Sequence, residues 1–80
     1  MKNIFISFES GDSALMYTET LTAEECVKFA NVVNKEHAVL DAVIDCYEIA
    51  DDDIQYYCIN GLIWADTPER ESRIRAIINN

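Results

Sequence analysis

The chain has 80 residues, half of them hydrophobic, and a formal net charge of −9. A chain of this length forms one domain with one modest core, which excludes a multidomain enzyme. The negative charge disfavours direct binding to nucleic acid or to an anionic membrane and favours basic partners. No apolar run is long enough for a membrane span or a signal-peptide core, so we expect a soluble cytoplasmic protein.

The first predicted element is a β-hairpin. Residues 3–8 are rich in β-forming side chains, residues 9–13 have turn composition, and residues 14–21 return to β-forming composition. Ile4 and Ile6 alternate with Phe5, so large apolar groups lie on both faces of the predicted sheet. The second face then needs a cover, which a second copy of the chain, a target protein or the connecting loops would provide.

A helix is predicted to follow the hairpin. Thr22 and Glu25 have the spacing of a capping box, which satisfies two free backbone N–H groups at a helix N-terminus. Residues at spacings of three and four then form one apolar stripe: Cys26, Phe29, Ala30 and Val33. We expect this helix to end near residues 34–36.

Residues 38–49 fit either a helix or a strand. We favour the strand, because residues 50–53 resemble a polar turn and residues 54–59 resemble a second strand. The dipeptide Asn60-Gly61 fits a hairpin turn or a glycine bulge within one long strand. A second helix is predicted after it, with Thr67 as N-cap, Pro68 at the first position, and an apolar side made of Ile74, Ile77 and Ile78.

The two predicted helices match in character at an offset of 45 residues, and each follows two strand-like segments. This pattern predicts a single α+β domain over residues 1–80, made of a first ββα unit (1–36) and a second one (37–80). The expected architecture is an antiparallel sheet of about four strands with two helices packed on one face. Whether the two units arose by duplication stays open.

Catalytic and metal-binding motifs are missing from the sequence. Cys26, Cys46 and Cys58 form no C-x-x-C pair and lie among apolar neighbours, so we expect free thiols in the core. Asp51–Asp53 lack the glycine and the final glutamate of a calcium loop, and neither glycine belongs to a phosphate-binding motif. His37 is expected at a helix end rather than in an active site. We therefore predict a chain that is not an enzyme and has no metal and no cofactor.

Acidic residues dominate the middle of the chain, because residues 36–66 hold eight acids and no Lys or Arg. Such a stretch is either a solvated surface or a docking surface for a basic partner. Three arginines lie near the C-terminus and are expected to neutralise either the acidic residues 41–53 or the acidic surface of a second subunit: Arg70, Arg73 and Arg75. The predicted partner-binding set combines the acids with exposed aromatic side chains: Asp41, Asp45, Tyr47, Glu48, Asp51, Asp52, Asp53, Tyr56, Tyr57 and Trp64.

The function predicted from these properties is that of a small binding protein that occupies the nucleic-acid-binding surface of a basic protein or nucleoprotein complex. In size and acidity the chain is similar to phage-encoded inhibitors of host defence, including anti-CRISPR and anti-restriction proteins that mimic nucleic acid; the resemblance implies action in the host cytoplasm. Toxin-neutralising immunity proteins share these traits. The alternative is a homodimeric structural or regulatory domain whose acidic surface serves solubility.

Overall fold

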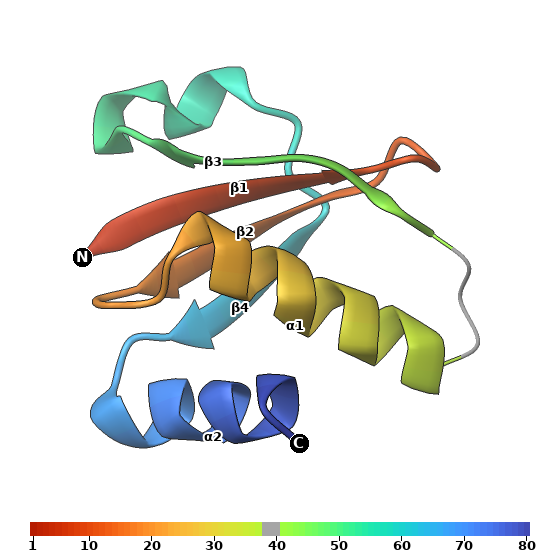
Figure 1. Ribbon diagram of the computed structural model, residues 1–80. Coiled ribbons are helices and arrows are strands. Elements are labelled where there is room, and N and C mark those ends of the chain that lie inside the picture. Colours follow the sequence, from red (N-terminus) through yellow and green to blue (C-terminus); the bar gives the residue numbers. More distant parts are fainter. Residues whose placement is uncertain (38–40) are drawn as a thin grey trace.

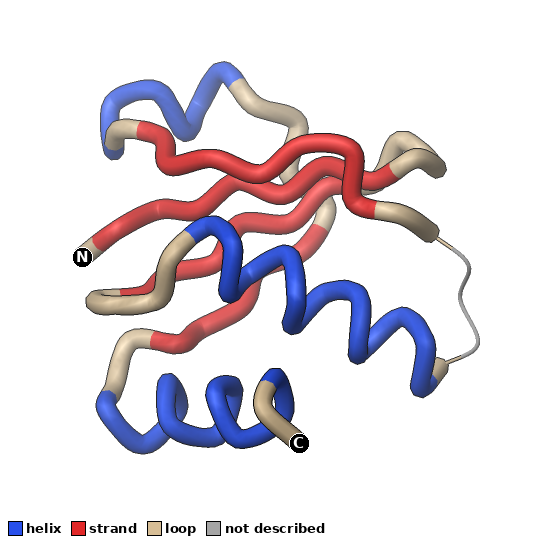
Figure 2. The backbone as a smooth tube through the Cα atoms, viewed as in Figure 1, coloured by secondary structure: helices blue, strands red, loops and turns tan. Residues whose placement is uncertain are grey.

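The computed structural model of the chain describes residues 1–37 and 41–80. In chain order its elements are β1 (Lys2–Phe8), β2 (Ser13–Thr18), α1 (Ala23–Glu36), β3 (Val43–Ile49), the 3-10 helix η1 (Asp51–Tyr56), β4 (Gly61–Ala65) and α2 (Pro68–Ile78) (Figure 1). One sheet has the strand order β3-β1-β2-β4, and both α-helices pack on the same face of it (Figure 2). The predicted α+β fold, with four strands and two helices on one face, is confirmed.

The sheet is mixed rather than fully antiparallel. β1 is antiparallel to both β2 and β3, whereas β4 runs parallel to β2. The two strands of the second predicted ββα unit, β3 and β4, therefore lie at opposite edges of the sheet and do not form a hairpin. The element order of the second half repeats that of the first half, but its strand pairing does not.

The predicted β-hairpin is formed by β1 and β2. The turn is closed by hydrogen bonds from the Phe8 N–H to the Asp12 carbonyl (2.9 Å) and from the Gly11 N–H to the Phe8 carbonyl (3.0 Å). Gly11 has a φ of 95°, a conformation that glycine adopts without steric cost. Ile4 pairs with Met16, and Phe5 pairs with Leu15, so each face of the hairpin carries its own apolar row.

Both helix starts are as predicted. The Thr22 hydroxyl accepts a hydrogen bond from the Glu25 N–H at 3.2 Å, and the Glu25 carboxylate accepts one from the Thr22 N–H at 3.1 Å. α1 ends at Glu36 with His37 as its C-cap. In α2 the Thr67 side chain accepts from the Arg70 N–H, and Pro68 stands in the first turn.

The main core lies between the helices and the sheet. Ile4, Ile6 and Met16 from the sheet pack with Cys26 of α1 and Ile74 of α2. Burial of these side chains supplies most of the stability of a domain of this size. The apolar side predicted for α2 is wrong in one position, because Ile77 is exposed while Ile78 is half-buried.

The connection between β3 and β4 differs from the prediction. Residues 43–49 of the predicted strand 38–49 do form β3, residues 41–42 have no regular structure, and residues 38–40 lie outside the described part of the chain. The strand predicted over 54–59 is wrong: η1 ends at Tyr56 and irregular chain follows. Three acids in the first turn of η1 favour this helical turn, because they complement the positive end of its backbone dipoles.

The dipeptide Asn60-Gly61 is neither a hairpin turn nor a bulge. Gly61 is the first residue of β4, whose partner is β2 on the far side of the sheet. Residues 50–60 therefore cross the sheet from one edge strand to the other, on the face opposite to α1 and α2. Ile54, Tyr57 and Ile59 of this crossing segment pack on Phe5, Leu15 and Ile49, so a loop covers part of the second face.

Candidate protein-binding surface

The sheet face opposite to α1 and α2, called here the open face, is organised in rows that run across the strands. The strand register aligns side chains of β4, β2, β1 and β3 at each level. The first row contains Trp64, Tyr17, Asn3 and Ile49; the second contains Leu62, Leu15, Phe5 and Tyr47; the third contains Ser13, Ser7 and Asp45. The first two rows are apolar and aromatic apart from Asn3, and the third row is polar, with the acid Asp45 on β3.

Hydrogen bonds fix the crossing segment at both ends. The Asn3 side-chain amide donates to the Asp51 carboxylate at the β3 end. At the β4 end the Ser13 N–H donates to the Asn60 side-chain oxygen (3.0 Å), and the Ser13 hydroxyl donates to the Cys58 carbonyl. The segment thus starts beside the first row and finishes beside the third row. It leaves two exposed corners, one on β2 and β4 and one on β3.

The first corner, called the Trp64 corner, consists of Tyr17, Leu62 and Trp64. The Tyr17 and Trp64 rings stack with centroids 4.3 Å apart and an interplanar angle of 17°. Trp64 remains 50% exposed and Leu62 55% exposed. Tyr17 thus covers one flank of the indole, and the rest of that side chain is open to solvent.

The second corner, called the Tyr47 corner, consists of Asp45 and Tyr47 on β3. The Tyr47 ring lies 5.6 Å from Phe5 and 6.3 Å from Tyr57, measured between centroids, and packs against both in tilted orientation. Interaction with the Tyr57 hydroxyl, and then partial burial, raise the pKa of Tyr47. Asp45 is exposed on the same side of β3, two residues before Tyr47.

The acids of η1 flank the open face. Asp51 is held by Asn3, whereas Asp52 and Asp53 are exposed in the first turn of η1. Tyr56, at the end of η1, is 77% exposed. An open hollow of about 510 Å³ is lined by Asp51, Asp52, Ile54 and Gln55. The structure therefore gathers Asp45, Tyr47, Asp51–Asp53, Tyr56 and Tyr57 on β3 and the crossing segment, and places Trp64 on the opposite edge strand.

Two members of the predicted set lie away from the open face. The Asp41 carboxylate accepts hydrogen bonds from the Ser10 N–H (2.9 Å) and hydroxyl (2.6 Å), so it braces the β1–β2 turn. Glu48 pairs in register with Ile4 and hence points to the helix side of the sheet. Asp41 therefore braces a turn and Glu48 is exposed to solvent on the helix side, so neither is placed to contact a partner that docks on the open face.

All six basic side chains lie on the helix side of the sheet. Lys2 shares the face of Ile4 and donates to the Leu21 carbonyl at 3.1 Å, and the other five belong to α1 and α2. Arg70 pairs with Asp66 at 2.6 Å, and Arg75 pairs with Glu25 at 2.9 Å. The expectation that the arginines neutralise residues 41–53 is therefore wrong for Arg70 and Arg75. The open face carries acidic charge alone, within the described residues.

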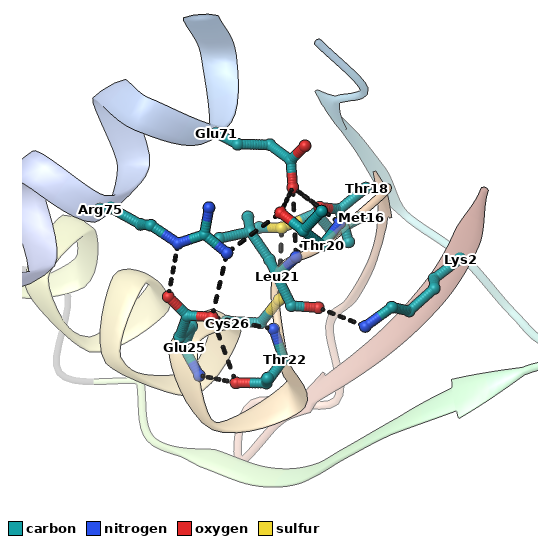
Figure 3. A network of polar contacts seen from close by, with 10 residues as sticks. All are labelled: Lys2, Met16, Thr18, Thr20, Leu21, Thr22, Glu25, Cys26, Glu71 and Arg75. Carbon is teal, nitrogen blue, oxygen red and sulfur yellow. Dashed lines mark hydrogen bonds and ion pairs between the residues drawn. The ribbon is translucent and has the colours of Figure 1, made fainter. Parts of the chain in front are cut away.

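A polar network that joins α2 to the end of β2 was not predicted (Figure 3). The buried Glu71 carboxylate accepts hydrogen bonds from the Thr18 hydroxyl (2.7 Å), the Thr20 hydroxyl (2.6 Å), the Thr20 N–H (2.8 Å) and the Leu21 N–H (3.2 Å). Burial by itself raises the pKa of Glu71, but these hydrogen bonds outweigh it, and the pKa falls to about 2.

Arg75 connects this network to α1. Its guanidinium donates to the Glu25 carboxylate and, at 3.1 Å, to the Thr20 hydroxyl. The hydrogen bond from Arg75 is the main cause that lowers the pKa of Glu25. A sequence signal for the network existed, because Glu71 lies three residues before Ile74 and thus shares the apolar side of α2.

The thiols differ in accessibility. Burial raises the pKa of Cys26 to about 12 and that of Cys46 to about 11. The predicted burial of Cys58 is wrong, because this residue lies in the irregular chain after η1 and is exposed. All three cysteines are free thiols.

Metal-binding clusters and membrane-spanning helices are both absent from the part of the chain that the structure describes, residues 1–37 and 41–80. No group of three or more His, Cys, Asp or Glu side chains in these ranges could hold a metal ion. Neither α-helix of the described chain combines the length and the apolar character that a membrane crossing requires.

Comparison with models of protein families, with curated proteins and with solved structures finds no match.

Proposed function

We propose that the chain is a binding protein whose open face docks on a positively charged surface of another protein, of the kind that contacts nucleic acid. Docking blocks that surface sterically and electrostatically, and the chain performs no reaction of its own. The partner is a basic protein or nucleoprotein complex in the cytoplasm, where the free thiols stay reduced. An inhibitor of a nucleic-acid-handling defence system would act in this way.

One observation carries the proposal: exposed aromatic side chains and acids share the open face, while all six cations lie on the helix side of the sheet. Aromatic residues are the usual anchors of protein interfaces, and a surface of one charge sign speeds the approach of an oppositely charged partner. The two corners supply anchors on both edges of the face. Asp52 and Asp53 supply charge on the β3 side of the face.

The experiment captures partners from a candidate host lysate on the immobilised chain and then works with the captured protein in purified form. Wild type is compared with the variant Asp51→Asn, Asp52→Asn, Asp53→Asn. A matched control neutralises three exposed acids elsewhere, Glu9→Gln, Glu36→Gln and Glu69→Gln, so that both variants have the same net charge.

The expected partner binds DNA or RNA, is displaced by that nucleic acid in competition, and is released at about 1 M salt, where charge screening acts within about 3 Å. The Asp51–Asp53 variant loses most of the binding, and the control keeps it. Equal loss in both variants would show that total charge matters rather than the open face. Binding that does not compete with nucleic acid would contradict the proposed mode of inhibition.

In the homodimer alternative, the open face binds a second copy of the chain instead of a basic partner. Pairing through the open face would bring together two copies that each carry a net charge of −9, and such like-charge contacts cost stability. For this reason we favour a basic partner. Sedimentation at low and high salt separates the two proposals, because a dimer of acidic faces would form at high salt only.

A further inference from the structure

The Trp64 corner has no acid among its three residues, so attraction to nearby carboxylates alone does not define what it binds. Trp64 is the only tryptophan of the chain and is half exposed at an edge strand. Its indole is stacked on Tyr17, which holds the ring in a fixed orientation and covers one of its two π faces. The uncovered π face is the surface that a ligand can reach.

The charge around this ring selects the class of ligand. In the described chain the basic side chains lie on the helix side, so no cation of the protein itself is placed to occupy the exposed π face. Across the first row, Asn3 lies next to Tyr17 and holds the Asp51 carboxylate. An aromatic ring in an acidic surface attracts cations through its quadrupole, and tryptophan is the strongest such ring.

Arginine fits this corner better than lysine. A guanidinium is planar and weakly hydrated, so it stacks on an indole while its N–H groups stay available for carboxylates. Basic proteins that handle nucleic acid present arginines for the same planar and charged contacts with phosphates. The Trp64 corner offers a stacking surface for a guanidinium, and the Asp51 carboxylate held by Asn3 offers a charge for another cation of the same partner.

We propose that the Trp64 corner is an arginine-binding site, in which the exposed face of the Trp64 indole stacks on a guanidinium of the basic partner. The inference rests on the proposed function, since it names the partner's side chain at one part of the same face. It also assigns the two corners separate tasks. Tyr17 and Trp64 select arginine, and the acids of the crossing segment provide attraction for any cation.

The test measures binding of two short peptides, hexa-arginine and hexalysine, to the intact chain at low salt by calorimetry. Fluorescence of Trp64, the only tryptophan, reports contact at the corner in wild type. The variant Trp64→Leu keeps an apolar side chain and removes the π face. Ile77→Ala is the control, because Ile77 is an exposed apolar residue of α2 outside the open face.

In wild type we expect hexa-arginine to bind about two- to fivefold more tightly than hexalysine, with a change in Trp64 emission. Trp64→Leu removes this preference, and Ile77→Ala retains it. Equal binding of the two peptides, or a preference that survives Trp64→Leu, would overturn the arginine site and leave the proposed function standing. Absence of binding to either peptide would count against both proposals.

Discussion

Glu71 of α2 accepts a hydrogen bond from the hydroxyl of Thr18 at the end of β2, at 2.7 Å, although the two residues are 53 positions apart in the chain. Thr18 follows Tyr17 of the Trp64 corner, and α2 follows β4, which carries Trp64. The contact thus ties together the two strands on which the stacked rings stand. The network of Figure 3 lies on the helix side of the sheet and joins α2 to the end of β2.

Replacing Glu71 by Gln should destabilise the fold. The amide supplies one neutral acceptor in place of a charged carboxylate, which leaves buried donors of Thr18 and Leu21 poorly satisfied, so we expect a loss of about 2 kcal/mol in the free energy of unfolding. Urea denaturation followed by circular dichroism measures it. Glu69→Gln on the exposed side of the same helix is the control and should change stability by less than about 0.5 kcal/mol. Equal effects would show that the network contributes nothing.

Acid should weaken the fold through the same residue. The pKa of Glu71 is lowered from 4.5 to about 2 in the folded state, so the carboxylate's contribution is complete above pH 4.5 and is lost as the pH falls toward 2. The pKa of Glu25 is also lowered, which adds to the loss in the same direction. Unfolding free energies measured from pH 7 to pH 2 test this. The Glu71→Gln variant should show a flatter decline than wild type, and an identical decline would contradict the assignment.

Thiol labelling should distinguish the three cysteines. Cys58 is exposed, so its thiol should react rapidly with a disulfide reagent at pH 8. This rapid reaction should consume one equivalent of reagent per chain. Cys26 and Cys46 have pKa values raised by burial to about 12 and about 11, so they should react only when the chain opens. Mass spectrometry of the labelled chain identifies the site. Rapid labelling of Cys26 in the native protein would contradict the core packing described.

The crossing segment makes a second small core, and this can be tested with two leucines of the same row. Leu15 is fully buried beneath the segment, whereas Leu62 is 55% exposed beside it. Leu15→Ala should cost about 2–5 kcal/mol of stability because it leaves a cavity. Leu62→Ala should cost less than about 1 kcal/mol, because little of its surface leaves water on folding. Similar losses for both would mean that the segment does not cover the open face as described.

The parts of the fold that could be predicted from the sequence are those encoded by neighbouring residues. The capping box of Thr22 and Glu25 and the Thr67-Pro68 pair identify the helix starts directly, because each satisfies local backbone groups. The β1–β2 hairpin is likewise local. Its apolar rows on both faces correctly indicated that the second face needs a cover.

The parts that could not be predicted depend on contacts far apart in sequence. Residues 54–59 have strand composition, but Ile54, Tyr57 and Ile59 pack on the open face from an irregular segment. Nothing local indicates that β4 pairs with β2 rather than β3, because the pairing is decided by where the crossing segment ends. The sequence also does not show which acids share a face of the sheet. It therefore predicts the acids and aromatic residues as one set, although Asp41 braces the β1–β2 turn and Glu48 lies on the helix side.

We propose that the open face, and not the acidic surface in general, binds the basic partner. Nuclear magnetic resonance of the isotope-labelled chain, titrated with hexa-arginine, separates these two surfaces because every backbone N–H reports its own surroundings. We expect shift changes to concentrate in residues 45–64 and at Tyr17, with small changes at the exposed acids of α1 and α2. Changes of equal size at Glu24, Glu36 and Glu69 would show that the acidic surface in general binds the peptide.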